Sequence, residues 1–182
     1  YYKGYTDKAL PVDVKVTYTL DGKEIKPEDL AGKSGKLTVR YDYTNNDKKT
    51  VKINGKKTDI YVPYLMATTA ILDTNVYSNV EVTNGKLISD GSRQILIGVA
   101  MPGLTKSLDL QDNEDIEIPE YVEFTADVKD FESTTALTVA TSDIFSKLDL
   151  SDIGDADDLQ DKLDELSDAT DELVDGTAEL YA

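Results

Sequence analysis

The sequence predicts a mainly β protein: an antiparallel β-sandwich followed by a C-terminal α-helix that starts a coiled-coil stalk. Three observations predict this fold class. Short segments of alternating apolar and polar residues fill the chain up to Ser142, and turns rich in Gly, Asn and Asp separate them. No long amphipathic helix intervenes between these segments. After Ser142 the composition becomes acidic, and leucines recur at heptad spacing.

The first strands are predicted by strict alternation. In residues 12–20, Val, Tyr and Leu alternate with Asp, Lys and Thr, which is typical of a strand with one buried face. Asp21-Gly22 predicts a hairpin turn, and residues 23–26 return as a short strand. Alternation resumes in residues 37–43 and ends at the turn-forming residues 45–47.

The same pattern continues through the rest of this region. The segment 64–72 is apolar on both faces and fits a buried strand, with a short helix as the alternative. Because the inward positions hold Val, Leu, Ile and Tyr, they favour a solid sandwich core over a ligand cavity. The other expected strands are a strand pair or one interrupted strand within 51–62 with a turn at Asn54-Gly55, a hairpin of 76–82 with 86–89 around Asn84-Gly85, then 94–101, 121–128 and 136–140.

Composition divides the chain into a β-sandwich domain (1–142), an acidic linker (143–158) and a heptad-repeat helix (159–182). Heptad a and d positions of the helix are Leu159, Leu163, Leu166, Thr170, Leu173, Thr177 and Leu180. Threonine offers little apolar area in this seam, and Gly176 costs about 1 kcal/mol inside a helix. We therefore expect the helix to need a partner, either another chain or a later segment of its own. The five leucines are the predicted interaction residues.

Charge and residue types exclude several classes of function. The net charge is −17, of which −12 lies in residues 143–182 (14 acids, 2 lysines) and −5 in residues 1–142 (22 acids, 17 bases). Nucleic acid and anionic lipid headgroups would repel such a chain. The chain has no His and no Cys, so a Ser-His-Asp triad, a Cys-His pair and the usual zinc sites cannot be built. We expect no enzyme.

Acidic clusters leave one metal alternative open. Glu114, Asp115, Glu117, Glu120 and Glu123 cluster in the sequence, and a solvated face explains them better than a catalytic carboxylate pair. Calcium prefers oxygen ligands, and the turn-prone acidic stretch supplies them, but the spacing of an EF-hand is absent. Helix capping and solvation are the favoured explanation, so no cofactor is expected and calcium is the alternative. The weak calcium candidates are Asp149, Asp152, Asp155 and Asp157.

Tyrosine is the main aromatic residue, with 11 Tyr, 3 Phe and no Trp. Exposed tyrosines can stack on sugars or line a protein interface. Alternation places Tyr18, Tyr41 and Tyr43 in the core. The candidates for an exposed binding surface are Tyr61, Tyr64 and Tyr77, together with Tyr1, Tyr2 and Tyr5.

Several strings resemble one family. They are residues 10–25 (LPVDVKVTYTLDGKEI), 30–35 (LAGKSG), 100–104 (AMPGL), 118–122 (IPEYV) and, in the tail, 173–177 (LVDGT). Together they resemble the extracellular regions of Gram-positive X-X-X-Leu-X-X-Gly heptad-repeat surface proteins, which are related to phage-infection-protein (Pip) type membrane proteins. The resemblance implies a place on the extracellular face of the envelope, a membrane anchor outside these residues and a longer stalk. It implies no catalytic residues.

The sequence therefore predicts a non-catalytic extracellular structural or interaction module of a membrane-anchored bacterial surface protein. Its partner would be another protein or a second copy bound through the C-terminal helix. The alternative is a carbohydrate-binding module for cell-wall or host glycans. The two differ in the surface that they need, because a glycan binder needs exposed tyrosines beside polar groups.

Overall fold

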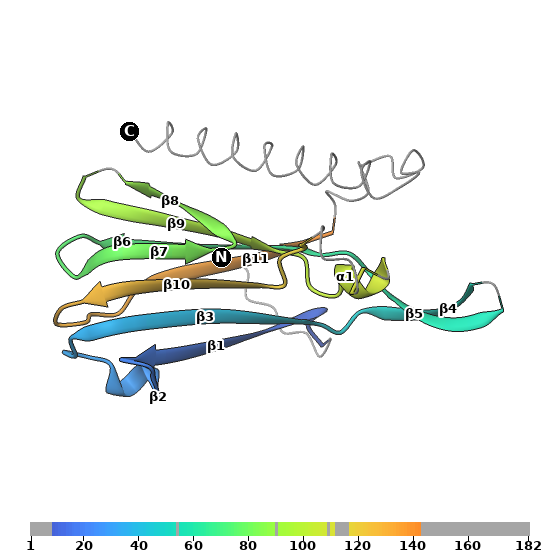
Figure 1. The fold of residues 1–182 in the computed structure, drawn as a ribbon, viewed down its shortest axis with the longest axis horizontal. Coiled ribbons are helices and arrows are strands. Elements are labelled where there is room, and N and C mark those ends of the chain that lie inside the picture. The colour runs from blue at the N-terminus through green and yellow to red at the C-terminus, as the bar shows by residue number, and fades with distance from the viewer. Residues whose placement is uncertain (1–8, 54, 90, 109, 112–116, 143–182) are drawn as a thin grey trace, which may run out of the picture.

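The computed structural model describes residues 9–142 except 54, 90, 109 and 112–116, and this part is built mainly from antiparallel strands. Two sheets stack into a sandwich, and a separate hairpin extends from one end of it (Figure 1). The predicted mainly β, antiparallel class is confirmed. The acidic linker (143–158) and the heptad-repeat helix (159–182) lie outside the described residues.

The sheets are built from strands distant in sequence. The five-stranded sheet has the order β2 (Lys23–Ile25), β1 (Val12–Leu20), β3 (Gly35–Asn45), β10 (Tyr121–Val128), β7 (Tyr77–Thr83). The four-stranded sheet has the order β11 (Thr135–Thr141), β6 (Leu65–Asp73), β9 (Arg93–Ala100), β8 (Gly85–Ser89). The separate hairpin is β4 (Lys48–Ile53) with β5 (Lys56–Tyr61), and the short helices are η1 (Pro27–Asp29) and α1 (Leu104–Ser107).

The first predicted hairpin is confirmed with its turn chemistry. Asp21 (φ 52°) and Gly22 (φ 77°) both lie in the left-handed region, which the tightest hairpin turns require of their two central residues. Asp21 also fixes the turn to β3, because its Oδ1 accepts the backbone N–H of Lys36 at 2.9 Å. The register of β1 on β2 follows from this turn.

The core lies between the two sheets. Alternation in β3 is confirmed, since Leu37, Val39, Tyr41 and Tyr43 are all buried. They belong to one apolar cluster with side chains of the opposite sheet, among them Leu72 of β6 and Leu96 of β9. The interior is a packed core, as the sequence predicts.

A buried chain of hydroxyls also joins the sheets. Tyr43 Oη lies 2.5 Å from Thr68 Oγ1, and Thr68 Oγ1 lies 2.7 Å from Thr138 Oγ1. Thr68 is fully buried, so these contacts satisfy a hydroxyl that water does not reach. They connect β3 of one sheet to β6 and β11 of the other.

The expected hairpin of residues 76–82 with 86–89 is wrong. β7 belongs to the five-stranded sheet and β8 to the four-stranded sheet, so the chain changes sheets at Asn84. An Asn-Gly hairpin turn needs both central residues at positive φ. Asn84 has φ 59°, but Gly85 lies outside the left-handed region and starts β8 instead.

The predicted buried face of β1 is only partly confirmed. Val12 is buried and Tyr18 packs against the core, whereas Val14 and Val16 are 42% and 37% exposed. The five-stranded sheet is one strand wider than the other, and β1 lies at the edge of the sandwich far from β8 (Figure 1). The inner face of β1 is therefore incompletely covered.

Candidate interaction surfaces

The outer face of the four-stranded sheet is apolar. In β6 the alternating residues Met66, Thr68, Ala70 and Leu72 are buried, so Ile71 lies on the opposite, outer side. The strand register places further apolar residues on this side, because residues paired across strands share a face. We call this set the apolar face: Ile71, Ile88, Ile95, Ile97, Leu137 and Val139.

Three side chains of the apolar face are strongly exposed. Leu137 is 64% exposed, Val139 51% and Ile71 46%, and the other three are half-buried. Monomeric soluble proteins rarely leave large contiguous apolar patches open to water. Sequence reasoning missed this face, although the uncharged run at residues 94–100 of β9 (QILIGVA) was a visible signal for it.

One end of the same side is already covered. Leu65 and Val99 also lie on the outer side of the sheet by register. There, Leu65 is buried in a second small cluster with Met101 and Ile118, against which Val99 packs. The segment that follows β9 thus begins a third layer over this sheet.

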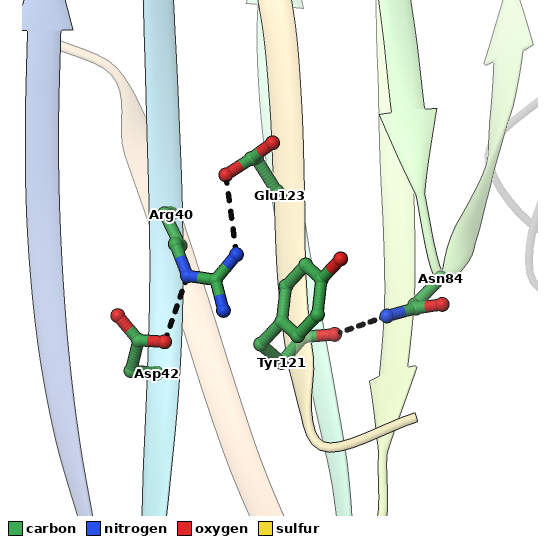
Figure 2. A network of polar contacts seen from close by, with 5 residues as sticks. All are labelled: Arg40, Asp42, Asn84, Tyr121 and Glu123. Carbon is green, nitrogen blue, oxygen red and sulfur yellow. Dashed lines mark hydrogen bonds and ion pairs between the residues drawn. The ribbon is translucent and has the colours of Figure 1, made fainter. Parts of the chain in front are cut away.

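The outer face of the five-stranded sheet is polar, and Figure 2 shows its central network. Arg40 of β3 donates from Nε to Asp42 Oδ1 at 2.8 Å and from Nη1 to Glu123 Oε2 at 3.5 Å. Its guanidinium carbon lies 3.6 Å from the ring centroid of Tyr121, and the carbonyl of Tyr121 accepts Asn84 Nδ2 at 2.8 Å (Figure 2). The network crosslinks β3 and β10 on a face that remains partly exposed.

The acids of the cluster that was expected to be a solvated face differ in their surroundings. Glu117 is exposed, as predicted. Glu123 does lie on an outer face but is held by Arg40, and Glu120 Oε1 accepts the Gly103 N–H at 3.2 Å. Glu114 and Asp115 lie outside the described residues. The two acids with contacts therefore have structural partners.

The hairpin β4–β5 carries a positive charge that sequence reasoning missed. Five lysines and a single acid, Asp59, fall between residues 48 and 61, a net of +4 in a chain of net −17. Asp59 accepts Lys48 Nζ at 2.8 Å and the Thr50 hydroxyl at 2.7 Å, and these hydrogen bonds lower the pKa of Asp59. Lys52 and Lys57 are exposed and face each other across the strands, a pairing of like charges that destabilises a hairpin.

Of the tyrosine candidates, Tyr61 and Tyr64 are half-buried at the base of this hairpin. The Tyr61 backbone N–H donates to Ser107 Oγ at 2.9 Å, and Tyr64 Oη donates to Asp47 Oδ2 at 3.3 Å. Lys106 Nζ lies 5.8 Å from the centroid of the Tyr61 ring. These contacts hold the hairpin against α1 and the end of β3.

Tyr77 is not a surface candidate, which corrects the prediction. It is buried, its hydroxyl is hydrogen-bonded to Thr134, and its ring packs edge-on against Phe131 with centroids 6.2 Å apart. Tyr77 starts β7, whose first residue faces the core, and burial raises the pKa of its hydroxyl. Tyr41 and Tyr43 are buried as predicted, Tyr18 packs against the core, and Tyr1, Tyr2 and Tyr5 lie outside the described residues.

The remaining candidate residues lie outside the described part of the chain. These are the calcium candidates Asp149, Asp152, Asp155 and Asp157, and the seam leucines Leu159, Leu163, Leu166, Leu173 and Leu180. Within the described ranges, no group of three or more His, Cys, Asp or Glu residues could hold a metal ion. In those same ranges, no helix has the length and apolarity to span a bilayer.

Comparison with known proteins gives no match to a family model, to a curated protein or to a solved structure. Three surfaces differ sharply in character: the apolar face, the polar network of Arg40 and the cationic hairpin.

Proposed function

We propose that the chain is a non-catalytic structural or interaction module on the extracellular face of a membrane-anchored bacterial surface protein. It acts through protein contacts. The observation that carries this proposal is the contrast between the two outer faces of the sandwich. One face is polar and internally paired, whereas the other exposes Ile71, Leu137 and Val139. An apolar sheet face of this kind is stabilised when another protein segment buries it.

A second observation supports a structural role. Several polar groups of the described region are engaged in contacts that hold strands together. The buried hydroxyl of Thr68 joins the two sheets, Arg40 joins β3 to β10, and Asp59 joins β4 to β5. The membrane anchor and the envelope location follow from the family resemblance alone.

The test is thiol labelling on intact cells that make the protein. The chain has no cysteine, so each introduced thiol is unique. Lys15→Cys places a thiol on the polar face of β1, and Leu137→Cys places one on the apolar face. With a membrane-impermeant maleimide, we expect fast labelling of Lys15→Cys and slow labelling of Leu137→Cys.

The two parts of the proposal fail in different ways. Labelling of Lys15→Cys only after the cells are permeabilised would contradict the extracellular location. Equal and fast labelling of both variants on intact cells would contradict the assignment of the apolar face as a contact surface. A cytoplasmic protein with an exposed thiol is the control for cell integrity.

Glycan binding is the second candidate, and Tyr61 and Tyr64 favour it because both rings stay partly exposed next to Lys106 and Asp47. Aromatic rings beside polar groups can stack on sugars. A screen of the purified chain against cell-wall and host glycans tests it. Binding that is lost in Tyr61→Ala but kept in Lys15→Cys would favour this candidate, and no binding would dismiss it.

A further inference from the structure

We infer that the apolar face is covered by the chain's own C-terminal segment, residues 159–180, whose leucines pack across the four-stranded sheet as a helix. The inference rests on the proposed function only in taking the apolar face as a contact surface. It names the occupant of that surface. It is independent of where in the cell the protein lies.

The apolar face needs a long, narrow cover. Five of its side chains come from three adjacent strands of one sheet: Leu137 and Val139 from β11, Ile71 from β6, and Ile95 and Ile97 from β9. The nine residues of β6 extend about 30 Å at the rise of an antiparallel strand. An α-helix of comparable length that lies along the strands would cover these side chains.

The C-terminal segment has that length and an apolar stripe. Residues 159–180 would form a helix of about 33 Å, and steps of four and three residues put all five leucines on one side of it. As a coiled-coil seam this stripe is weak, because two of its positions are threonine. An apolar sheet is a broader partner that does not require a second stripe of the same spacing.

Chain connectivity brings the segment to this sheet. β11 is the edge strand that carries Leu137 and Val139, and it ends at Thr141. The 17 residues from 142 to 158 can span up to about 55 Å when extended, which is enough to return over the sheet. Tethering also favours the chain's own segment over a free partner, because a short linker gives a local concentration in the millimolar range.

Charge favours the same occupant. The segment 143–182 has a net charge of −12, whereas the outer side of the sheet carries two cations, Lys86 of β8 and Arg93 of β9, and one acid, Asp73 of β6, by register. Acidic side chains that flank the leucine stripe would lie near these cations. A second copy is a poorer occupant, since two chains of net −17 repel each other. The cluster of Leu65, Met101 and Ile118 already covers one end of this side, so the segment would extend an existing layer.

Disulfide trapping in the purified chain of 182 residues tests the inference. Leu137→Cys is combined with Leu166→Cys, Leu163→Cys or Leu173→Cys in separate variants, so that three registers of the segment on the sheet are sampled. The matched controls are Leu137→Cys with Asp168→Cys, whose thiol lies about 200° around a helix from position 166, and Lys15→Cys with Leu166→Cys. Mild oxidation should give a disulfide within one chain in a leucine variant and none in the controls.

Thiol reactivity gives an independent readout that needs no register. In the single variant Leu137→Cys, maleimide labelling should be about tenfold slower than in Lys15→Cys, because a packed segment must open before the thiol reacts. Adding Leu166→Asp and Leu173→Asp should bring the two rates together. Circular dichroism of every variant checks that the β domain stays folded.

The outcomes separate the inference from the proposed function. A disulfide between two chains would overturn the inference and make a second copy the occupant, while the apolar face would remain a contact surface. Fast labelling of Leu137→Cys in the purified chain, with no disulfide in any pair, would also overturn the inference. The labelling on intact cells then decides by itself whether another protein covers the face.

Discussion

Gly98 of β9 marks a point where the two sheets approach each other closely. A Cβ atom added at this position would lie 2.2 Å from Cγ1 and 2.7 Å from Cγ2 of Val122, which belongs to β10 in the other sheet. Val122 is fully buried and cannot move into solvent. The backbone of Gly98 does not lie in the left-handed region, so the glycine is required by space and not by its φ angle. Gly98→Ala should therefore destabilise the fold.

The size of the effect follows from two opposing contributions. Adding a methyl group to a packed core costs about 1 to 3 kcal/mol. Replacing Gly by Ala also restricts the unfolded chain, which stabilises the folded state by about 0.4 to 1 kcal/mol. The free energy of unfolding should thus fall by about 0.5 to 2 kcal/mol. At roughly 2 to 4 °C per kcal/mol for a chain of this size, the melting temperature should fall by about 1 to 8 °C.

Urea denaturation of Gly98→Ala, Val122→Ala and the double variant measures this effect. Val122→Ala alone removes two buried methyl groups and should cost about 1 to 3 kcal/mol. In the double variant the new methyl group occupies the space vacated at Val122, so the total cost should be at least about 1 kcal/mol below the sum of the single costs. A neutral or stabilising Gly98→Ala, or simple additivity in the double variant, would refute the close approach of β9 and β10.

Three further predictions concern the hydroxyl chain, the buried tyrosines and the surface network. Thr68→Val should lower the free energy of unfolding by about 1 to 3 kcal/mol, because it leaves the hydroxyls of Tyr43 and Thr138 without this partner. Thr138→Val, at a half-buried position, should cost less in the same denaturation experiment. Burial raises the pKa of Tyr41 above its ordinary value of 10.0, so the unfolded state loses this proton first and stability should fall as the pH rises beyond about 10. Tyr41→Phe should make that loss shallower, as followed by tyrosinate absorbance and circular dichroism; an unchanged alkaline transition would be inconsistent with the raised pKa. Arg40→Ala should cost less than about 1 kcal/mol, because its side chain is 36% exposed, and the cost should shrink further in high salt.

Local patterns predict the strands well. In β3, alternation identifies Leu37 and Tyr43 as core residues, because a strand in the middle of its sheet has one face buried along its whole length. The Asp21-Gly22 turn is predictable for a similar reason. Its left-handed backbone depends on two adjacent residues and not on the rest of the fold.

Partner choice between strands is not a local property. Asn84-Gly85 has the composition of a hairpin turn, yet the chain leaves one sheet and enters the other there, since Gly85 packs tightly against β9. A Cβ at Gly85 would lie 2.4 Å from the Ile97 carbonyl oxygen. The burial of Tyr77 follows from the same long-range arrangement. A sequence pattern that describes one strand at a time predicts neither the change of sheet at Asn84-Gly85 nor the burial of Tyr77.

The surface residues were predicted less well than the strands, because the tyrosines were chosen as candidates and the lysines of β4–β5 were overlooked. Tyrosines are conspicuous in the composition, but Tyr77 is a core residue, and Tyr61 and Tyr64 make contacts that hold the hairpin to the domain. The local positive charge of the β4–β5 lysines is outweighed by the negative net charge of the whole chain. Both features become visible only when side chains are assigned to a face or to a projecting element, which requires the sheet order.

Residues 95–100 of β9 are apolar on both faces of the four-stranded sheet. The alternate residues Leu96, Gly98 and Ala100 are buried in the sandwich core. Burial of these three residues alone would allow polar residues at 95, 97 and 99. Those positions are instead Ile, Ile and Val. A strand that is apolar on both faces is typical of a sheet covered on both sides. Val99 is covered by the segment after β9, whereas Ile95 and Ile97 belong to neither apolar cluster of the described residues. Substituting Ile97→Thr should therefore destabilise the full chain of 182 residues and have little effect once Leu166→Asp and Leu173→Asp have removed the leucine stripe. Equal destabilisation in both backgrounds would mean that the apolar outer side of β9 serves the sheet itself and not a covering segment.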